Sequence, residues 1–279
     1  MTAGGVDFID IDWAGCTISI EHQWIAGPKS APLMVFLHEG LGSVSMWKDF
    51  PQRLCAAAGC RGLVYSRPGY GRSTPRAADK ALQPDFMHRQ AYEVLPALLQ
   101  VLKIEVEIDR PWLLGHSDGG SISLLYAAAF PQRIAGVIVL APHILVEDLS
   151  LASIEKARTA FLQTDLPHRL ARHHDNAASV FWGWNNVWLS PGFRNWNIEN
   201  EIGAIGCPLL AVQGIDDEYG TLAQIRGIAN RVAEAELLEL PACGHSPHRD
   251  QAGPLLACVS AFMQQHLHAG QTESSKANR

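Results

Sequence analysis

The stretch that most constrains this chain runs from residue 112 to residue 120, Trp-Leu-Leu-Gly-His-Ser-Asp-Gly-Gly. A short apolar run, typical of a buried strand, is followed at once by an Ala/Leu-rich helix former that begins at Asp118. Ser117 therefore falls on a tight turn from a strand into a helix. Gly115 and Gly119 flank it two residues away on either side, where the turn leaves no room for a Cβ. The pattern predicts a strained, exposed serine in the position of a nucleophile.

A serine between two glycines is by itself more often an ordinary turn residue than a catalytic one. The nucleophile interpretation gains weight from residues further along the chain, because an acidic residue and a histidine come later in the order Ser, Asp, His. Each of them lies just after a predicted strand. We therefore favour the nucleophile over the ordinary turn.

The remaining sequence alternates short apolar runs with stretches of helical periodicity. The predicted strands are an amino-terminal hairpin (6–13 and 17–25), then 33–37, 62–66, 112–114, 134–140, 208–213 and 236–240. The predicted helices are 46–58, 86–102 with a kink or boundary at Pro96, 121–130, 153–161, 166–174, 222–233 and 253–266. This order indicates an α/β fold with a mostly parallel, twisted sheet and helices on both faces. Reactive loops then gather at the carboxyl ends of the strands.

The alternation stops between residues 143 and 206, where charge, histidine and tryptophan become frequent. We expect this segment to be a helical cap inserted into one α/β core formed by residues 1–142 and 207–269. Residues 270–279 are polar, and we expect them to be disordered. Four of the eight tryptophans lie in the cap, and three of them are candidate substrate-binding residues: Trp182, Trp184 and Trp188. Aromatic residues of this kind could equally form the core of the cap.

Composition narrows the class of partner. The net charge of −6, without a cluster of Lys or Arg, gives no footprint for nucleic acid or for an anionic membrane surface, so we expect a small-molecule substrate. The amino terminus lacks the features of a signal peptide, and the six cysteines are scattered through apolar segments. We expect a cytoplasmic protein with reduced thiols, no cofactor and no metal. The sequences His173-His-Asp175 and His38-Glu-Gly40 do not have the spacing of a convincing metal site.

A serine nucleophile requires a base within hydrogen-bond reach, and that base requires an acidic partner. The loop after the predicted strand 208–213 offers Asp217, with Asp216 and Glu218 as neighbours that could instead form a solvated acidic turn. The loop after strand 236–240 offers His245, with His248 as the competitor. Loop position favours Asp217 and His245.

An oxyanion that develops at an acyl carbon needs two N–H donors. One candidate is the backbone of Asp118, and the other is Gly40 or Leu41 in the loop after strand 33–37. The Asp118 side chain could stabilise its helix N-terminus or bind a cationic group of a substrate. Glu39 is unusual beside an oxyanion site, so we expect it to point away, to pair with a cation such as Arg67, or to take part in binding.

The motifs Leu37-His-Glu-Gly-Leu-Gly-Ser43, Arg67-Pro-Gly-Tyr-Gly-Arg-Ser73, Gly115-His-Ser-Asp-Gly119, Gly214-Ile-Asp-Asp217 and Cys243-Gly-His245 together resemble those of the α/β-hydrolase fold family. The resemblance is to the capped group that contains carboxylesterases, lactonases and carbon–carbon bond hydrolases of aromatic degradation. It implies that Ser117 is the nucleophile, Asp217 the acid and His245 the base. It also implies an oxyanion hole built from Gly40 and Asp118.

The sequence departs from the carbon–carbon hydrolases at Ser246, where they typically carry tryptophan. The main hypothesis is therefore a serine hydrolase that cleaves an ester of a small apolar or aromatic acid. Lactone, thioester and carbon–carbon cleavage remain alternatives, because they use the same machinery. A ligand-binding receptor on the same fold is the non-enzymatic alternative.

Overall fold

The chain folds around one eight-stranded sheet with the strand order β1-β2-β4-β3-β5-β6-β7-β8. Its structure is a computed structural model that describes residues 4–77 and 80–277, with side chains to residue 267 other than that of Ile108. The strands are β1 (Val6–Trp13), β2 (Cys16–Ile25), β3 (Leu33–Leu37), β4 (Arg61–Tyr65), β5 (Trp112–His116), β6 (Gly136–Leu140), β7 (Leu209–Gly214) and β8 (Ala235–Leu240). The β1–β2 and β2–β4 pairs are antiparallel and all the others are parallel, as the sequence predicts.

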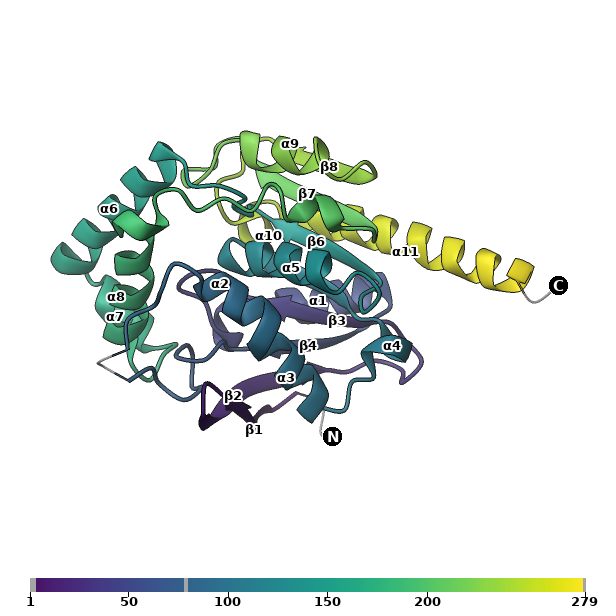
Figure 1. Cartoon of the computed structure of the whole chain (residues 1–279), viewed down its shortest axis with the longest axis horizontal. Coiled ribbons are helices and arrows are strands. Elements are labelled where there is room, and N and C mark those ends of the chain that lie inside the picture. The colour runs from purple at the N-terminus through teal and green to yellow at the C-terminus, as the bar shows by residue number, and fades with distance from the viewer. Residues whose placement is uncertain (1–3, 78–79, 278–279) are drawn as a thin grey trace.

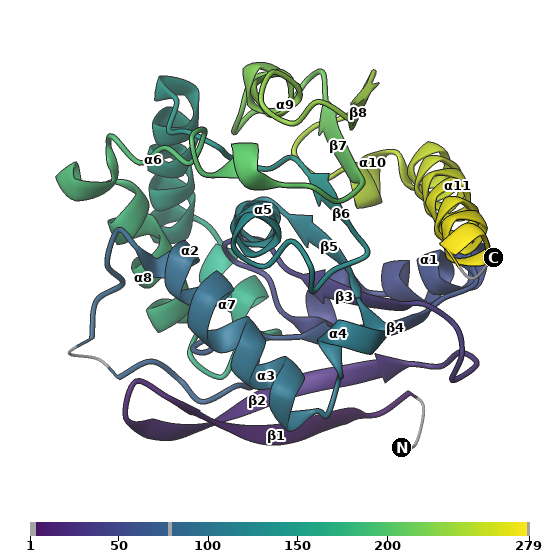
Figure 2. The same ribbon diagram turned by 45° about the vertical axis from the view of Figure 1, so that its right-hand side comes forward.

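Helices cover both faces of the sheet. They are α1 (Phe50–Ala58), α2 (Phe86–Arg89), α3 (Leu95–Val101), α4 (Val106–Asp109), α5 (Asp118–Ala129), α6 (Asp148–Gln163), α7 (Leu166–Ala171), α8 (Ala177–Trp188), α9 (Ala223–Ala229), α10 (Pro247–Asp250) and α11 (Ala252–Ala277). In Figure 2, α1 and α11 lie on one side of the sheet, and α3 and α5 lie on the other. The family of folds expected from the sequence is therefore the one observed.

Strand β3 shows why the central strands read as continuously apolar. Leu33, Val35 and Leu37 pack into the core under α3 and α5, and the alternate residues Met34 and Phe36 pack into the core under α1 and α11. All five side chains are buried. A strand covered on both faces has no polar side, so apolar and polar residues do not alternate along its sequence.

Two predicted helices differ from the observed ones. The segment 46–58 is split into a 3-10 turn (Val44–Trp47) and α1, because Lys48 takes a positive φ of 54° and a new helix begins at Phe50, with Pro51 in its first turn. The segment 86–102 stays helical through Pro96. A π-helical turn (Gln90–Val94) joins α2 to α3 and adjusts the backbone just before the proline.

The segment between β6 and β7 leaves the sheet as a helical insertion made of α6, α7 and α8 (Figure 1). An isolated antiparallel bridge between Leu145 and Asn197 joins its two ends. Helix α8 was not predicted, although Asn176 caps it by accepting a hydrogen bond from Ser179 N at 2.9 Å. The assignment of residues 143–206 as a separate cap stays a prediction.

Helix α11 projects past the body of the molecule toward the carboxyl terminus (Figure 1). It continues to Ala277, whereas the sequence led us to expect a disordered tail from residue 270. The segment contains no proline, and each residue added to an existing helix gains one backbone hydrogen bond. Residues 278–279 of that segment lie outside the described residues. Across the part of the chain that the structure describes, no helix combines the length and apolarity needed to cross a membrane.

Candidate active site

Ser117 lies on the turn between β5 and α5 with a φ of 53° and a ψ of −119°. This is a strained backbone conformation for a residue other than glycine. A Cβ on Gly115 would overlap the carbonyl of Gly119, and a Cβ on Gly119 would overlap the carbonyl of Leu37. The steric requirement inferred from the sequence is therefore confirmed, whereas the expected exposure is wrong, because Ser117 is only 7% exposed. The turn holds the hydroxyl of Ser117 above the carboxyl end of β5.

Replacing Gly119 by alanine is expected to destabilise the protein by at least about 2 kcal/mol, because the new methyl group meets rigid backbone rather than a movable side chain. The matched control is Gly253→Ala in α11, where nothing lies within 4 Å of the added Cβ. That change should be neutral or stabilising by up to about 1 kcal/mol. Urea unfolding of both variants provides the measurement. Equal midpoints would contradict the steric account of the turn.

His245 bridges Ser117 and Asp217. Its Nε2 lies 2.9 Å from Ser117 Oγ, and its Nδ1 lies 2.8 Å and 3.0 Å from the two carboxylate oxygens of Asp217. Because Nδ1 faces an acceptor, the proton of the neutral ring belongs on Nδ1, which leaves Nε2 free to accept the proton of Ser117. The three residues expected from the sequence are thus brought together, in an arrangement that can activate a serine hydroxyl.

Asp217 is fixed by several donors. It accepts hydrogen bonds from Tyr219 N at 2.8 Å, Gly220 N at 3.2 Å and Gln213 Nε2 at 3.1 Å. Burial by itself would raise the pKa of Asp217, but its hydrogen bond and charge interaction with His245 lower that pKa below the usual range. Asp217 is therefore ionised at neutral pH and is positioned to stabilise a protonated His245.

The competing residues are placed elsewhere. The side chain of Asp216 is exposed, and Glu218 accepts a hydrogen bond from His245 N through its carboxylate, at 3.1 Å. The ring of His248 packs against Trp47, with ring centroids 5.0 Å apart, and against His116 at 4.8 Å. The histidine that is hydrogen-bonded to the Ser117 hydroxyl is thus His245 and not His248.

The two backbone N–H groups expected to form the oxyanion hole, those of Gly40 and Asp118, have no hydrogen-bond acceptor among the described residues. Asp118 is the first residue of α5, so its N–H has no acceptor within the helix. The N–H of Gly40 makes no hydrogen bond to any of the described residues. A Cβ on Gly40 would overlap the indole of Trp184, so this loop lies directly under α8.

The side chain of Asp118 is fully buried and pairs with two groups. Its Oδ2 lies 3.4 Å from Arg67 Nη2, and its Oδ1 accepts a hydrogen bond from Trp188 Nε1 at 3.2 Å. Burial raises the pKa of Asp118, and Arg67 and Trp188 oppose that rise. Because each carboxylate oxygen already has a partner, Asp118 is not available to bind the cationic group of a substrate.

Of the three alternatives for the Glu39 side chain, pairing with a cation is the one observed, but the cation is not Arg67. Its carboxylate lies 3.5 Å from His116 Nδ1 and 3.7 Å from Arg249 Nη2. His116 in turn contacts the carbonyl oxygen of His245 through Nε2 at 2.6 Å. Burial by itself would raise the pKa of Glu39, but His116, His248 and Arg249 hold that pKa well below its usual range. Glu39 thus links the first loop to the segment that carries His245.

The three candidate tryptophans take different positions on α8. Trp184 and Trp188 are four residues apart and share the face that meets Gly40 and Asp118. Trp182 lies on another face, where it packs against Phe161 and Phe181. Trp188 is only 1% exposed and uses its N–H on Asp118, so Trp184 is the better candidate for substrate contact.

The sequence analysis missed two buried residues of the site. One is His143, and the other is Arg67 in its role as the partner of Asp118. The ring of His143 lies 5.8 Å from that of His245 and 5.0 Å from that of Trp188, and burial lowers its pKa to about 3. Both residues follow a strand, β4 or β6, at its carboxyl end. Their position just after a predicted strand was the one sequence feature that could have marked them as candidate site residues.

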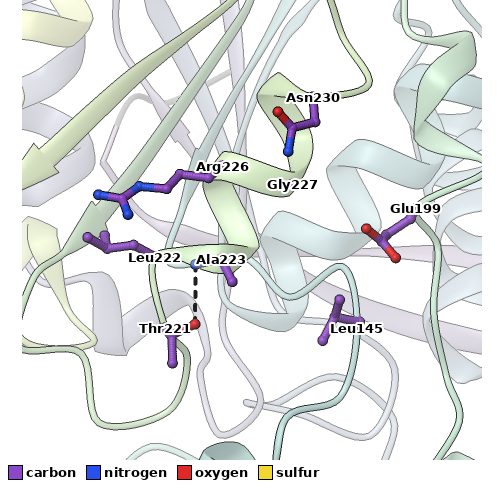
Figure 3. Close-up of a pocket in the computed structure, with 8 residues that line it drawn as sticks. All are labelled: Leu145, Glu199, Thr221, Leu222, Ala223, Arg226, Gly227 and Asn230. Atoms are coloured by element: carbon purple, nitrogen blue, oxygen red, sulfur yellow. Dashed lines mark hydrogen bonds between the residues drawn. The ribbon is translucent and has the colours of Figure 1, made fainter.

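Two cavities of the structure lie near α9 and near the β1–β2 hairpin. One, of about 570 Å³, borders α9, and Figure 3 shows the eight residues that line it. Its charged side chains are already paired, Arg226 with Glu239 at 2.7 Å and Glu199 with Arg231 at 3.0 Å. The other, of about 480 Å³, lies between the β1–β2 hairpin and the loop before α2, and Arg67 and Tyr70 form part of its wall. Ser117 lines neither cavity.

A parallel sheet with a strained serine between β5 and α5, and with a histidine and an aspartate on later loops, is the arrangement typical of the α/β-hydrolase class. The sequence profile of the alpha/beta hydrolase fold family matches residues 32–204. The chain belongs to that family.

Similar proteins have varied names. The chain is 27% identical over 247 residues to the "Putative carbamate hydrolase RutD" of Variovorax paradoxus, covering 81% of this chain and 89% of that protein. It is 24% identical over 269 residues to the 2-hydroxy-6-oxo-6-phenylhexa-2,4-dienoate hydrolase of Burkholderia cepacia, covering 85% and 89%. The crystal structure of the enol-lactonase from Burkholderia xenovorans superposes with a TM-score of 0.71 at 23% identity, covering 92% and 100%. These likenesses agree on the fold and differ in the bond cleaved.

Proposed function

We propose that the protein is a serine hydrolase that cleaves a carboxylic ester of a small apolar or aromatic acid through an acyl-enzyme intermediate. The observation that carries this proposal is the continuous set of contacts from Asp217 through His245 to Ser117, on a strained turn. Such a set is what a serine hydroxyl needs to act as a nucleophile at neutral pH.

In the proposed reaction, Ser117 Oγ attacks the acyl carbon while His245 Nε2 takes the hydroxyl proton. The carbonyl oxygen becomes an oxyanion that accepts hydrogen bonds from the N–H groups of Gly40 and Asp118. The intermediate collapses, the C–O bond to the leaving group breaks, and His245 returns the proton to the departing alcohol. Water, deprotonated by His245, then attacks the acyl-enzyme to release the acid and restore Ser117. Asp217 stabilises the transient imidazolium.

We further propose that residues 143–206 form a cap over this site and that Trp184 contributes to the acyl pocket. The close approach of Trp184 to Gly40 supports this role, because the acyl group of a bound ester must lie next to the oxyanion donors. The cytoplasmic location expected from the sequence also remains a proposal.

The names of the relatives favour a second candidate, cleavage of a carbamate, a lactone or a carbon–carbon bond by the same residues. Turnover of p-nitrophenyl esters from acetate to benzoate, together with a phenyl carbamate, an aryl lactone and 2-hydroxy-6-oxo-6-phenylhexa-2,4-dienoate, tests both candidates. We expect hydrolysis of the esters, with the highest kcat/KM for a small apolar or aromatic acid. Selective turnover of one of the other three compounds would replace the ester assignment. No turnover of any of them, combined with tight ligand binding, would support the receptor alternative.

A further inference from the structure

The carbonyl group of Glu39 accepts an unusual number of hydrogen bonds. Its donors are His38 Nδ1 at 2.7 Å, Arg67 Nη2 at 2.9 Å and Gly42 N at 3.0 Å. A carbonyl oxygen has two lone pairs, so this acceptor is saturated. The peptide group between Glu39 and Gly40 therefore cannot rotate without breaking several bonds at once.

Arg67 fixes one of the other donors as well. Its backbone N–H donates to His38 Nε2 at 3.0 Å, so the proton of the neutral His38 ring must lie on Nδ1, facing the carbonyl of Glu39. Burial and the charge of Arg67 hold the pKa of His38 well below its usual range, which keeps the ring neutral. One of the three donors to this carbonyl is thus the Arg67 side chain, and a second, His38, is oriented by the backbone N–H of the same residue, which substitutions at position 67 retain.

The hydrogen bonds to the Glu39 carbonyl also affect the N–H of Gly40, which belongs to the same peptide group. The peptide is trans, so the N–H of Gly40 points opposite to the carbonyl of Glu39 and away from Arg67. Donors on the carbonyl, one of them cationic, polarise the peptide and make its N–H a stronger donor. This N–H, which has no acceptor among the described residues, is one of the two donors of the proposed oxyanion hole.

The guanidinium also reaches the second donor segment. The same nitrogen, Nη2, lies 3.4 Å from Oδ2 of Asp118, the residue whose backbone N–H is the other oxyanion candidate. The guanidinium stacks over the ring of Tyr70 at 4.4 Å, and the Arg67 side chain is 1% exposed. One buried, restrained nitrogen thus joins the loop after β3 to the start of α5.

We propose that Arg67 is a positioning residue of the oxyanion hole, which orients and polarises the Gly40 N–H and holds it in register with the Asp118 N–H. The inference rests on the proposed hydrolase function. Arginine suits the role because its planar fork offers several donors in fixed directions, whereas the ammonium of lysine rotates. Arg67 acts through the backbone of Gly40 and does not itself touch the reacting atoms.

The test compares Arg67→Met, Arg67→Lys and the double variant Arg67→Met/Asp118→Asn. The double variant avoids an unpaired buried carboxylate, and Arg67→Lys keeps a cation beside Asp118, so these two guard against loss of folding. Arg133→Met removes an exposed arginine that lies over Phe130 and serves as the control. The readouts are kcat and KM for the best p-nitrophenyl ester, together with inhibition by a trifluoromethyl ketone and by the uncharged primary amide of the same acid.

We expect kcat to fall by about 10- to 100-fold in the methionine variants and less in Arg67→Lys. The inhibition constant of the ketone, which mimics the oxyanion, should rise by the same factor as kcat/KM falls. The inhibition constant of the uncharged primary amide should stay within about twofold, because this ground-state ligand makes no oxyanion.

Folded variants with unchanged kcat and unchanged ketone affinity would overturn the inference. Equal weakening of ketone binding, primary-amide binding and substrate binding, the last seen as a raised KM, would also overturn it, because that result indicates general distortion of the site. Absence of turnover by the unmutated protein would instead refute the proposed function. The two failures are therefore distinguishable.

Discussion

Ser117→Ala is expected to lower kcat/KM for the best ester by about 10⁴- to 10⁶-fold, with correct folding retained. The hydroxyl is the atom that forms the acyl bond, and neither Gly115 nor Gly119 can be replaced by a residue with a nucleophilic side chain, because a Cβ there would overlap neighbouring backbone. Any remaining rate comes from direct attack of water on the bound ester. Steady-state kinetics at neutral pH, with circular dichroism as the check on folding, provides the measurement.

Ser123→Ala is the matched control for this variant. Ser123 lies in the same helix, is also buried, and donates its hydroxyl to the carbonyl of Gly119 at 2.8 Å. Its loss should leave kcat/KM within about threefold of the unmutated value, because a single neutral hydrogen bond contributes little to the site. A similar collapse of activity in both variants would indicate a structural rather than a chemical role for Ser117.

Asp217→Asn is expected to lower kcat by about 10⁴-fold while KM changes little. An asparagine amide can donate to His245 Nδ1, which favours the tautomer with the proton on Nε2. That tautomer can no longer accept the proton of Ser117, whereas substrate contacts are unaffected. The effect should therefore appear in the chemical step.

The neighbouring Asp216→Asn provides the comparison, since the side chain of Asp216 is exposed and Asp217 is the residue that pairs with His245. It should leave kcat within about twofold. If Asp216→Asn proved as damaging as Asp217→Asn, the assignment of the acidic partner would be wrong. Comparison of the two variants thus decides between Asp216 and Asp217. From the sequence alone, the choice between them rested on their position in the loop.

Much of the fold can be predicted from local pattern. The continuous apolar runs of β3 to β7 predict buried parallel strands, and the carboxyl ends of such strands meet at one edge of the sheet. The loops that carry Ser117, Asp217 and His245 consequently converge, although Ser117 and His245 are 128 residues apart. The position of each motif after a predicted strand was therefore sufficient to predict that these three loops lie together.

The features that could not be predicted depend on contacts between distant segments. The pairing of Arg67 with Asp118 rather than with the Glu39 carboxylate is set by the direction in which each side chain leaves its loop. Helix α8 was missed because its sequence is apolar or aromatic almost all round and is interrupted by Gly183. Gly183 leaves room there for the guanidinium of Arg76, which a Cβ would overlap.

The most direct test of the proposed mechanism is intact-mass analysis after reaction with a fluorophosphonate, on the unmutated protein and on Ser117→Ala and Ser123→Ala. A nucleophilic Ser117, activated by His245, predicts one covalent adduct on the unmutated protein and on Ser123→Ala, and none on Ser117→Ala. An adduct that persists in Ser117→Ala, or an unmutated protein that hydrolyses esters without forming any adduct, would contradict the assignment of Ser117 as the nucleophile.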